Sequence, residues 1–216
     1  MRSAEVPQEA LVCVVDDDEA IRRSLSRLFR SVRLQAEAFP SATAFLQREP
    51  YEGPSCVVLD LRMPGVDGLE LQGTLAAREE QIVFLTGHGD VPTCARAMKA
   101  GAVDFLVKPV DDEDLLGAVS RALARSARIR QHLGERAGMR ARIDELTPRE
   151  FEVMQHVIAG MLNKQIADEL NFAEKTVKVH RGRMMQKMRV TSVADLVRAA
   201  QVAGVAPLTP ARCSPS

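Results

Sequence analysis

The stretch "LVCVVDDDEA", residues 11–20, decides how the first half of the chain folds. Five apolar residues are followed at once by three aspartates and a glutamate. Two like charges about 4 Å apart repel each other by roughly 4 kcal/mol at an effective dielectric constant near 20. A chain that gathers carboxylates at the end of an apolar run therefore needs something at that place that offsets the repulsion.

Short apolar runs alternate with helical patterns through the first half of the chain. The runs lie at 11–15, 56–59, 82–85 and 105–107, with a weaker one at 35–39. Between the first two, apolar residues recur with helical spacing, as at Ile21, Leu25 and Phe29. Near-continuous apolar strands that alternate with helices are typical of a parallel sheet covered on both faces. The sequence therefore predicts an α/β domain with a five-stranded, doubly wound parallel sheet.

The net charge of zero conceals two halves of opposite charge. Residues 1–125 carry 20 acidic and 14 basic side chains, whereas residues 126–216 carry 9 acidic and 15 basic ones. An acidic half joined to a basic half suggests two tasks, one of them on a polyanion. At 216 residues, two domains of ordinary size are also the natural expectation.

Several classes of protein are disfavoured by composition. The sequence has no run of 18 apolar residues, and its first ten residues lack the apolar region of a signal peptide. We therefore expect a soluble, cytoplasmic protein without membrane association. Cys13 and Cys56 lie in apolar runs and are expected to be buried reduced thiols. The tail, residues 208–216, is expected to be disordered.

Polar side chains follow the predicted strands at one end. Asp16 and Asp17 follow the first strand, Asp60 closes the third, Thr86 the fourth and Lys108 the fifth. In open α/β sheets the ligand site lies outside the carboxyl ends of the strands. Three carboxylates, a hydroxyl and an ammonium group are thus expected to converge on one edge of the sheet.

This convergence predicts a divalent cation among the carboxylates. Mg²⁺ takes carboxylate and carbonyl oxygens and keeps several waters, which leaves room for a phosphoryl oxygen. With the metal bound, Asp60 can act as a nucleophile toward a phosphoryl group. Lys108 would then hold one phosphoryl oxygen, and the Thr86 hydroxyl could donate to another.

Four segments together carry a family resemblance. They read "VVDDDEA", "LDLRMPGVDG", "FLTGHGD" and "AVDFLVKPV". In this joint spacing, residues 9–125 resemble the flavodoxin-like receiver domain of bacterial two-component response regulators. The resemblance implies that Asp60 accepts a phosphoryl group from a sensor histidine kinase. It also implies that Asp17, Asp60 and the backbone carbonyl of Arg62 hold Mg²⁺, with Asp16 contributing through a water molecule.

Two further features follow from the resemblance. Phe105 matches an aromatic residue whose rotamer follows that of the threonine, here Thr86. Lys108–Pro109 matches a peptide bond that is cis in the family, and cis bonds occur essentially before proline.

Plainer explanations exist for each of these residues. Asp16–Asp18 could cap the following helix, whose N-terminus favours negative charge, and Asp18 could do only this. Thr86 and Lys108 taken singly could be ordinary strand-end residues, and Phe105 could be ordinary core. His88 lies between glycines and is expected to be a loop residue rather than a general base.

The second half of the chain shows only helical patterns. Residues 126–142 are polar and basic, and are expected to continue the preceding helix as a helical linker. Thr147 and Glu150 form a capping box, with Pro148 at the first helical position. The segments "NKQIADEL" and "NFAEKTVKVHRGRMMQKM" predict a short helix, a turn and a longer basic helix. If Val177 of the longer helix faces inward, Met184 and Met188 lie on the same side.

The series "LTPRE…AGMLNKQIADEL…EKTVKVHR…KM" resembles a LuxR-type helix-turn-helix domain over residues 143–207. With the receiver in front, the whole chain resembles a NarL/FixJ-type transcriptional regulator that binds promoter DNA. Matching positions imply three base-facing residues, Lys178, Val179 and Gly182. The other expected DNA contacts, mainly to phosphates, are Lys164, Lys175, Thr176, Arg183 and Lys187.

Three positions depart from the expected pattern or from a DNA role. Ala173 occupies the N-cap of the recognition helix, where loss of a capping side chain typically costs about 0.5–2 kcal/mol. Gly182 removes a possible base contact and weakens the helix by about 1 kcal/mol. Arg181 falls near the buried side and is expected to extend its head group to water or to pair with Glu150.

The leading hypothesis is a DNA-binding regulator switched by phosphorylation. Phosphorylation of Asp60 would draw Thr86 and Phe105 inward and reshape the face formed by residues 91–125, which would then form a homodimer. One rival is a phosphatase with an aspartyl nucleophile, but the position two residues after Asp60 is Arg62, which cannot protonate a leaving group. Another rival is a regulator that binds DNA without phosphorylation.

Overall fold

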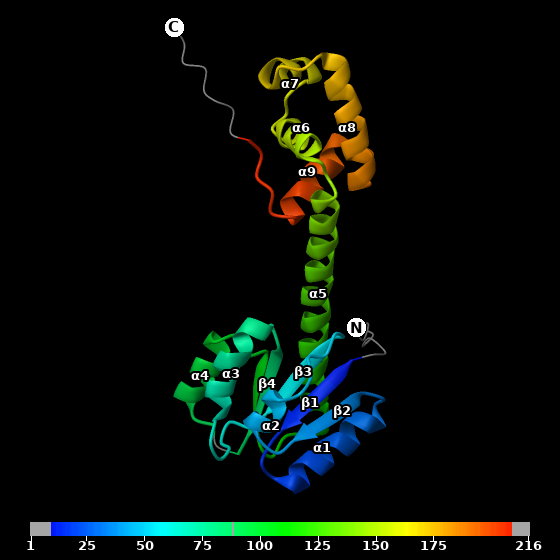
Figure 1. Cartoon of the computed structure of the whole chain (residues 1–216). Helices are drawn as coiled ribbons and strands as arrows, with labels where there is room; N and C mark the ends of the chain where they lie inside the picture. The colour runs from blue at the N-terminus through cyan, green and yellow to red at the C-terminus, as the bar shows by residue number, and fades with distance from the viewer. Residues whose placement is uncertain (1–9, 88, 209–216) are drawn as a thin grey trace. The chain divides into compact units, whose positions relative to one another are not determined.

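The computed structural model describes residues 10–87 and 89–208 (Figure 1). The described residues up to Gln131 form one compact unit, and those from His132 onward form a second. One helix, α5 (Asp112–Asp144), contributes residues to both units. The expected divisions at residues 125/126 and 142/143 lie within this helix and stay predictions.

A five-stranded parallel sheet forms the centre of the first unit. Its strands are β1 (Leu11–Val15), β2 (Gln35–Phe39), β3 (Ser55–Leu59), β4 (Gln81–Thr86) and β5 (Asp104–Val107). They lie in the order β2-β1-β3-β4-β5, and every neighbouring pair is parallel. Each strand lies within one residue of the apolar run that predicted it, so the prediction of a doubly wound α/β sheet is confirmed.

Helices cover both faces of this sheet (Figure 1). The helices before α5 are α1 (Glu19–Ser31), α2 (Ala42–Leu46), α3 (Gly68–Leu75) with the 3-10 turn η1 (Ala76–Arg78), and α4 (Val91–Lys99). Side chains of α1 and α5 pack on one face with Val12 and Val14 of β1. Side chains of α2, α3 and α4 pack on the other face with Cys13 and Val15. The central strands are therefore buried on both sides, which explains why their sequences are apolar without alternation.

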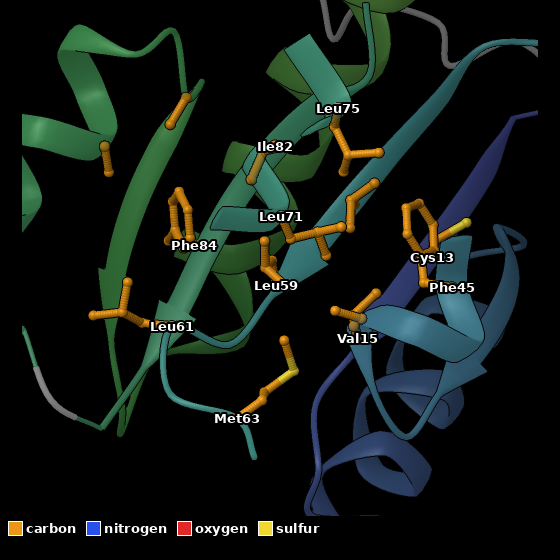
Figure 2. Close-up of a cluster of buried hydrophobic side chains, with 14 of the residues drawn as sticks. Cys13, Val15, Phe45, Leu59, Leu61, Met63, Leu71, Leu75, Ile82 and Phe84 are labelled. Atoms are coloured by element: carbon orange, nitrogen blue, oxygen red, sulfur yellow. The ribbon is translucent and has the colours of Figure 1, made fainter. Parts of the chain in front are cut away.

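The core on the α3 side is continuous across the sheet. Figure 2 shows Leu71 and Leu75 of α3 directed toward Leu59 and Ile82 of the strands. Phe84 of β4 belongs to the same cluster and is fully buried. This packing fixes α3 against the strands that end at the polar edge.

Cys13 and Cys56 are buried free thiols, as predicted. Burial is the main cause that raises the pKa of Cys13 to about 12, and burial also raises the pKa of Cys56 well above its ordinary value. Cys94 is half-buried on α4. The predicted disorder of the tail falls, apart from Leu208, outside the described residues.

The second unit is all-helical. After the end of α5 it contains α6 (Pro148–Ile158), α7 (Asn163–Leu170), α8 (Glu174–Met188) and α9 (Val193–Val202). The capping box of Thr147 and Glu150 begins α6, with Pro148 in its first turn, as predicted. Val177, Met184 and Met188 of α8 are fully buried in one cluster with residues of α6, α7 and α9. The expected four-helix domain with a helix-turn-helix is confirmed.

A turn of three residues joins α7 to α8. Asn171 has a left-handed backbone conformation with φ of 54°, which asparagine tolerates better than most residues. Phe172 then contacts the core, and Ala173 precedes the first residue of α8. None of the helices in the described part of the chain is long and apolar enough to cross a membrane.

Replacing Leu71 by alanine is expected to lower the free energy of unfolding of the first unit by about 2–5 kcal/mol, because Leu71 is fully buried and the change leaves a cavity. Urea denaturation followed by tyrosine emission would measure the change, since Tyr51 is the one tyrosine and the chain has no tryptophan. Val91→Ala is the control: Val91 is 83% exposed, and the change should stay within about 0.5 kcal/mol.

Candidate functional site

The carboxyl ends of the strands bring the predicted residues to one edge of the sheet. Val15 and Leu59 are partners in the β1–β3 ladder, so Asp16 and Asp60 follow neighbouring strands. The amide of Asp60 donates to the carbonyl of Val15 over 2.9 Å. On the other side, the amide of Lys108 donates to the carbonyl of Thr86 over 2.8 Å. The backbone therefore holds Asp60 beside the end of β1, and Lys108 beside the end of β4.

The ammonium group of Lys108 bridges two carboxylates. Lys108 Nζ lies 2.6 Å from Oδ2 of Asp16 and 3.2 Å from Oδ2 of Asp60. Burial lowers the pKa of Lys108, but its hydrogen bonds and charge interactions with Asp16 and Asp60 outweigh that effect, and the net pKa is raised. Lys108 is therefore a fixed positive charge between two side chains that would otherwise repel each other.

The carboxylates of Asp16, Asp17 and Asp60 suit a small divalent cation. Their oxygen atoms lie within 4.8 Å of one another, with Asp16 buried, Asp60 half-buried and Asp17 exposed. Three negative charges face the one ammonium group of Lys108 in this set, so negative charge remains to be offset. Hard oxygen donors with one side open to water are what Mg²⁺ takes in proteins.

Helix capping explains Asp18 but not Asp16. Oδ1 of Asp18 accepts hydrogen bonds from the amides of Ala20 and Ile21 over 2.7 and 3.4 Å, and so caps α1. Asp16 instead accepts from the amide of Asp18 through Oδ1 and binds Lys108 through Oδ2. Asp18 thus caps α1, as one of the predictions had it, whereas Asp16 binds Lys108.

Thr86 and Phe105 lie beside the acidic edge. Thr86 is fully buried at the end of β4. The ring of Phe105 packs against Phe84 with 5.8 Å between ring centroids. A Cβ atom at Gly89 would come within 2.9 Å of Phe105, so the glycine leaves the ring its room. The Lys108–Pro109 peptide bond is cis, as the resemblance implied. His88, which was expected to be a loop residue, lies outside the described part of the chain.

Sequence reasoning missed two residues of the site. Arg22 donates from Nη1 to the backbone carbonyl of Asp16 over 2.6 Å, and nothing in the local sequence points to this contact. Gly68 begins α3 next to the Asp60 loop, the segment 60–67 between β3 and α3. A Cβ atom at Gly68 would lie 2.6 Å from the carbonyl oxygen of Asp60. The signal for Gly68 was present, since it ends the quoted segment "LDLRMPGVDG".

In the second unit, the residues expected to contact DNA lie on one side of α8 and at the start of α7. The exposed ones are Lys164, Lys175, Thr176, Lys178, Val179, Gly182 and Arg183. They lie away from the buried side formed by Val177, Met184 and Met188. The ion pair between Nζ of Lys178 and Oε1 of Glu174, 2.9 Å apart, is exposed to solvent and therefore weak. This side of α8 carries the positive charge that a DNA groove requires.

The partner predicted for Arg181 of α8 needs correction. The suggested pair of Arg181 with Glu150 is wrong, because Arg181 donates to Oδ1 of Asn163 over 2.7 Å. Glu150 instead binds Lys187 at 2.6 Å, and Lys187 also donates to the carbonyl of Glu145 over 3.0 Å. Lys187 is thus partly used inside the unit, and its expected contact with a DNA phosphate stays a prediction.

The starts of α7 and α8, the two helices of the helix-turn-helix, differ in capping from six of the other helices. Asp18, Ser41, Asp67, Asp90, Thr147 and Ser192 each cap a helix with a side chain. Ala173 at α8 and Leu162 at α7 cannot do so, because neither side chain has an oxygen. The predicted loss at Ala173 is therefore confirmed, and Leu162 adds a second.

Two family models match the chain in succession. Residues 12–120 match the response regulator receiver domain, and residues 144–200 match the bacterial regulatory proteins of the LuxR family. Together with the sheet edge and the helix-turn-helix, they define a receiver that is coupled to a DNA-binding domain. The chain belongs to the two-component response regulators of this receiver and LuxR-type class, and is a transcriptional regulator.

Individual relatives match over nearly the whole chain. Nodulation protein W of Bradyrhizobium diazoefficiens is 47% identical over 93% of this chain and 89% of its own. The transcriptional regulatory protein FixJ of Azorhizobium caulinodans is 43% identical over 94% of this chain and 97% of its own. The solved structure of the response regulator StyR has a TM-score of 0.82 and 45% identity, over 89% of this chain and 98% of that one.

Replacing Glu150 by glutamine should destabilise the second unit in a pH-dependent manner. Burial raises the pKa of Glu150, but the hydrogen bonds from Lys187 and Thr147 outweigh that effect and lower the pKa below 4.5. The stabilisation from the carboxylate is therefore complete above pH 4.5 and is lost as the pH falls through the lower folded pKa. At pH 7 we expect a loss of about 1–3 kcal/mol, shrinking in acid.

Urea denaturation by circular dichroism would measure this change, with Tyr51 emission marking the unfolding of the first unit separately. Glu152→Gln is the matched control, because Glu152 pairs with Arg149 at the surface and should contribute little. An effect of Glu150→Gln that is as large at pH 3 as at pH 7 would contradict the assignment.

Proposed function

We propose that Asp60 accepts a phosphoryl group from a sensor histidine kinase with the help of Mg²⁺. Phosphorylation promotes dimerisation through residues 91–125 and sequence-specific binding of promoter DNA by α8. The observation that carries the proposal is the bridge of Lys108 between Asp16 and Asp60 at the sheet edge. We also propose that the protein acts in the cytoplasm and does not itself associate with a membrane.

In the transfer step, a carboxylate oxygen of Asp60 attacks the phosphorus atom of a phosphohistidine. The new O–P bond forms as the P–N bond breaks, and the electron pair leaves with the imidazole nitrogen. Lys108 stabilises the charge on one phosphoryl oxygen as it exchanges its contact with Asp60. When bound, Mg²⁺ offsets the repulsion between the carboxylate and the phosphoryl group. Asp17, Asp60 and the carbonyl of Arg62 would hold it directly, and Asp16 through water.

The proposed switch runs from the phosphoryl group to Thr86 and Phe105. The Thr86 hydroxyl donates to a phosphoryl oxygen, and Phe105 turns inward behind it. The burial of Thr86 and the half-buried position of Phe105 beside Phe84 support this route. The switch can be no larger than the difference in the phosphoryl group's stabilisation of the two arrangements.

The proposed dimer surface lies on α4, β5 and the first part of α5. Large apolar side chains are exposed there, with Val91 at 83% and Val107 at 50% of their possible surface, and Met98 at 42%. We infer that these side chains form part of an apolar patch of the kind that is typical of protein interaction sites. A dimer would bring two copies of α8 to half-sites about one helical turn of DNA apart.

A regulator needs one phosphorylation per signal, whereas an enzyme needs turnover. We propose that this chain is no enzyme, since the position that would protonate a leaving group, two after Asp60, is Arg62. Arg62 contributes its amide to Oδ1 of Asp60 over 3.4 Å. Steady release of product from a phosphomonoester, far above one equivalent per chain, would contradict this proposal.

Asp60→Ala is expected to abolish labelling by acetyl phosphate and the dimerisation that follows it, because it removes the nucleophile. Intact mass spectrometry would detect the added phosphoryl group, and analytical ultracentrifugation the dimer. Chelation of Mg²⁺ with EDTA should suppress labelling of the wild-type chain. Asp18→Asn is the matched control, since asparagine keeps the cap of α1 and labelling should persist. Unchanged dimerisation of Asp60→Ala would reject the mechanism.

Two substitutions on α8 should separate base contacts from phosphate contacts. Lys178→Ala is expected to cost about 1–3 kcal/mol of binding and to relax the sequence preference at one position. Arg183→Ala should weaken binding to all sequences alike and reduce the slope of log affinity against log salt by about 1. Fluorescence anisotropy on the chain's own upstream DNA at several salt concentrations would measure both. Arg198→Ala on α9 is the control, and an equal loss in that variant would refute the assignment.

A further inference from the structure

Helix α4 is attached to the first unit by few buried side chains. Of its nine residues only Ala97 is fully buried, while Thr93 and Cys94 are half-buried. Helix α3, by contrast, buries Gly68, Leu71, Gln72 and Leu75 within eight residues. An element with so little buried surface is at the low-stability end of its domain, and its position depends on each remaining contact.

One of those contacts is made by a buried glutamine. Gln72 is only 4% exposed, and its Nε2 donates to the backbone carbonyl of Ala97 over 2.9 Å. The same carbonyl accepts a hydrogen bond from the amide of Ala102 over 3.1 Å. Gln72 therefore binds the backbone at the last turn of α4 without being needed to satisfy that carbonyl.

Helix α3 is in turn held by the Asp60 loop. The amide of Gly68 donates to the carbonyl of Leu61 over 2.8 Å, and Gly68 touches the backbone of Asp60 so closely that no Cβ atom fits. Leu71 and Leu75 fix the rest of α3 against the strands (Figure 2). A continuous series of tight contacts thus runs from the Asp60 backbone through α3 to the carbonyl of Ala97.

We propose that Gln72 is a positioning residue that transmits the state of Asp60 to α4 and so sets the dimerisation response. The inference rests on the proposed function, because it assumes that phosphorylation of Asp60 drives dimerisation through α4. Leucine would fill the same space at this buried place, so packing alone does not require an amide. An amide hydrogen bond is directional, and it ties the end of α4 to one position on α3.

Spatial intermediacy alone does not demonstrate coupling, so the test measures the coupling itself. For the full chain, the dimer dissociation constant is measured by analytical ultracentrifugation with Mg²⁺ alone, and with Mg²⁺ plus beryllium fluoride as a phosphoryl mimic. The coupling is the dissociation constant with Mg²⁺ alone divided by the dissociation constant with Mg²⁺ plus beryllium fluoride. In Gln72→Leu we expect this ratio to fall at least fivefold below the wild-type ratio. Labelling of Asp60 by acetyl phosphate should stay within twofold of the wild-type rate.

The chain offers a matched control in Gln81, which is equally buried at 4% and also donates from Nε2 to a backbone carbonyl, that of Glu79. It lies at the start of β4, at the other end of the sheet from Asp60. Gln81→Leu should leave the ratio unchanged. Gln72→Glu keeps the size of the side chain and removes the donor, so it should lower the ratio as Gln72→Leu does.

Hydrogen exchange gives a second readout that does not depend on dimerisation. In Gln72→Leu the amides of α4 should exchange at least tenfold faster, with those of β1 and β3 unchanged. An unaltered ratio in Gln72→Leu, or an equal fall in Gln81→Leu, would overturn this inference and leave the proposed function standing. A wild-type chain that is labelled but does not dimerise would overturn both.

Discussion

The contact on which the first unit depends is the bridge of Lys108 between Asp16 and Asp60. Parallel strands point their carboxyl ends to one edge, and this sequence places carboxylates after two adjacent central strands. Left alone, these charges would repel each other in a partly buried place. The ammonium group of Lys108, which follows β5, offsets part of that repulsion, and the remaining negative charge makes the edge suited to a cation. Stability and chemistry therefore have the same origin here.

The rest of the fold keeps that edge in place while leaving one neighbour loosely held. Two apolar cores clamp the central strands from both faces, and α3 is packed tightly under the Asp60 loop. Helix α4 has only Ala97 fully buried and exposes apolar side chains to solvent. A rigid site beside a weakly attached helix is an arrangement in which a small local change can shift a surface.

The sequence predicted those features that depend on short-range pattern. The strands followed from apolar runs, and the convergence of Asp16, Asp60 and Lys108 followed from the strand ends. The buried side of α8 followed from the helical spacing of Val177, Met184 and Met188. Each of these inferences needs only the period of one element and a rule for how parallel strands align.

What the sequence did not predict depends on partners from separate elements. A helical wheel places Arg181 near the core, but it cannot say that Arg181 donates to Asn163. It also does not say that Lys187 binds Glu150. In the same way, no local signal relates Arg22 to the carbonyl of Asp16, or Gln72 to that of Ala97. These contacts are decided by how helices settle against one another.

The burial of Cys13 has a consequence for the kinds of signal that this half of the chain can receive. Burial raises the pKa of Cys13 to about 12, so little of this thiol is a thiolate at pH 7, and the thiolate is the form that oxidants and alkylating agents attack. Buried in the sheet and largely protonated, Cys13 is therefore a poor target for peroxide and electrophiles. Oxidation of this thiol is therefore poorly suited to carry a signal to the acidic edge.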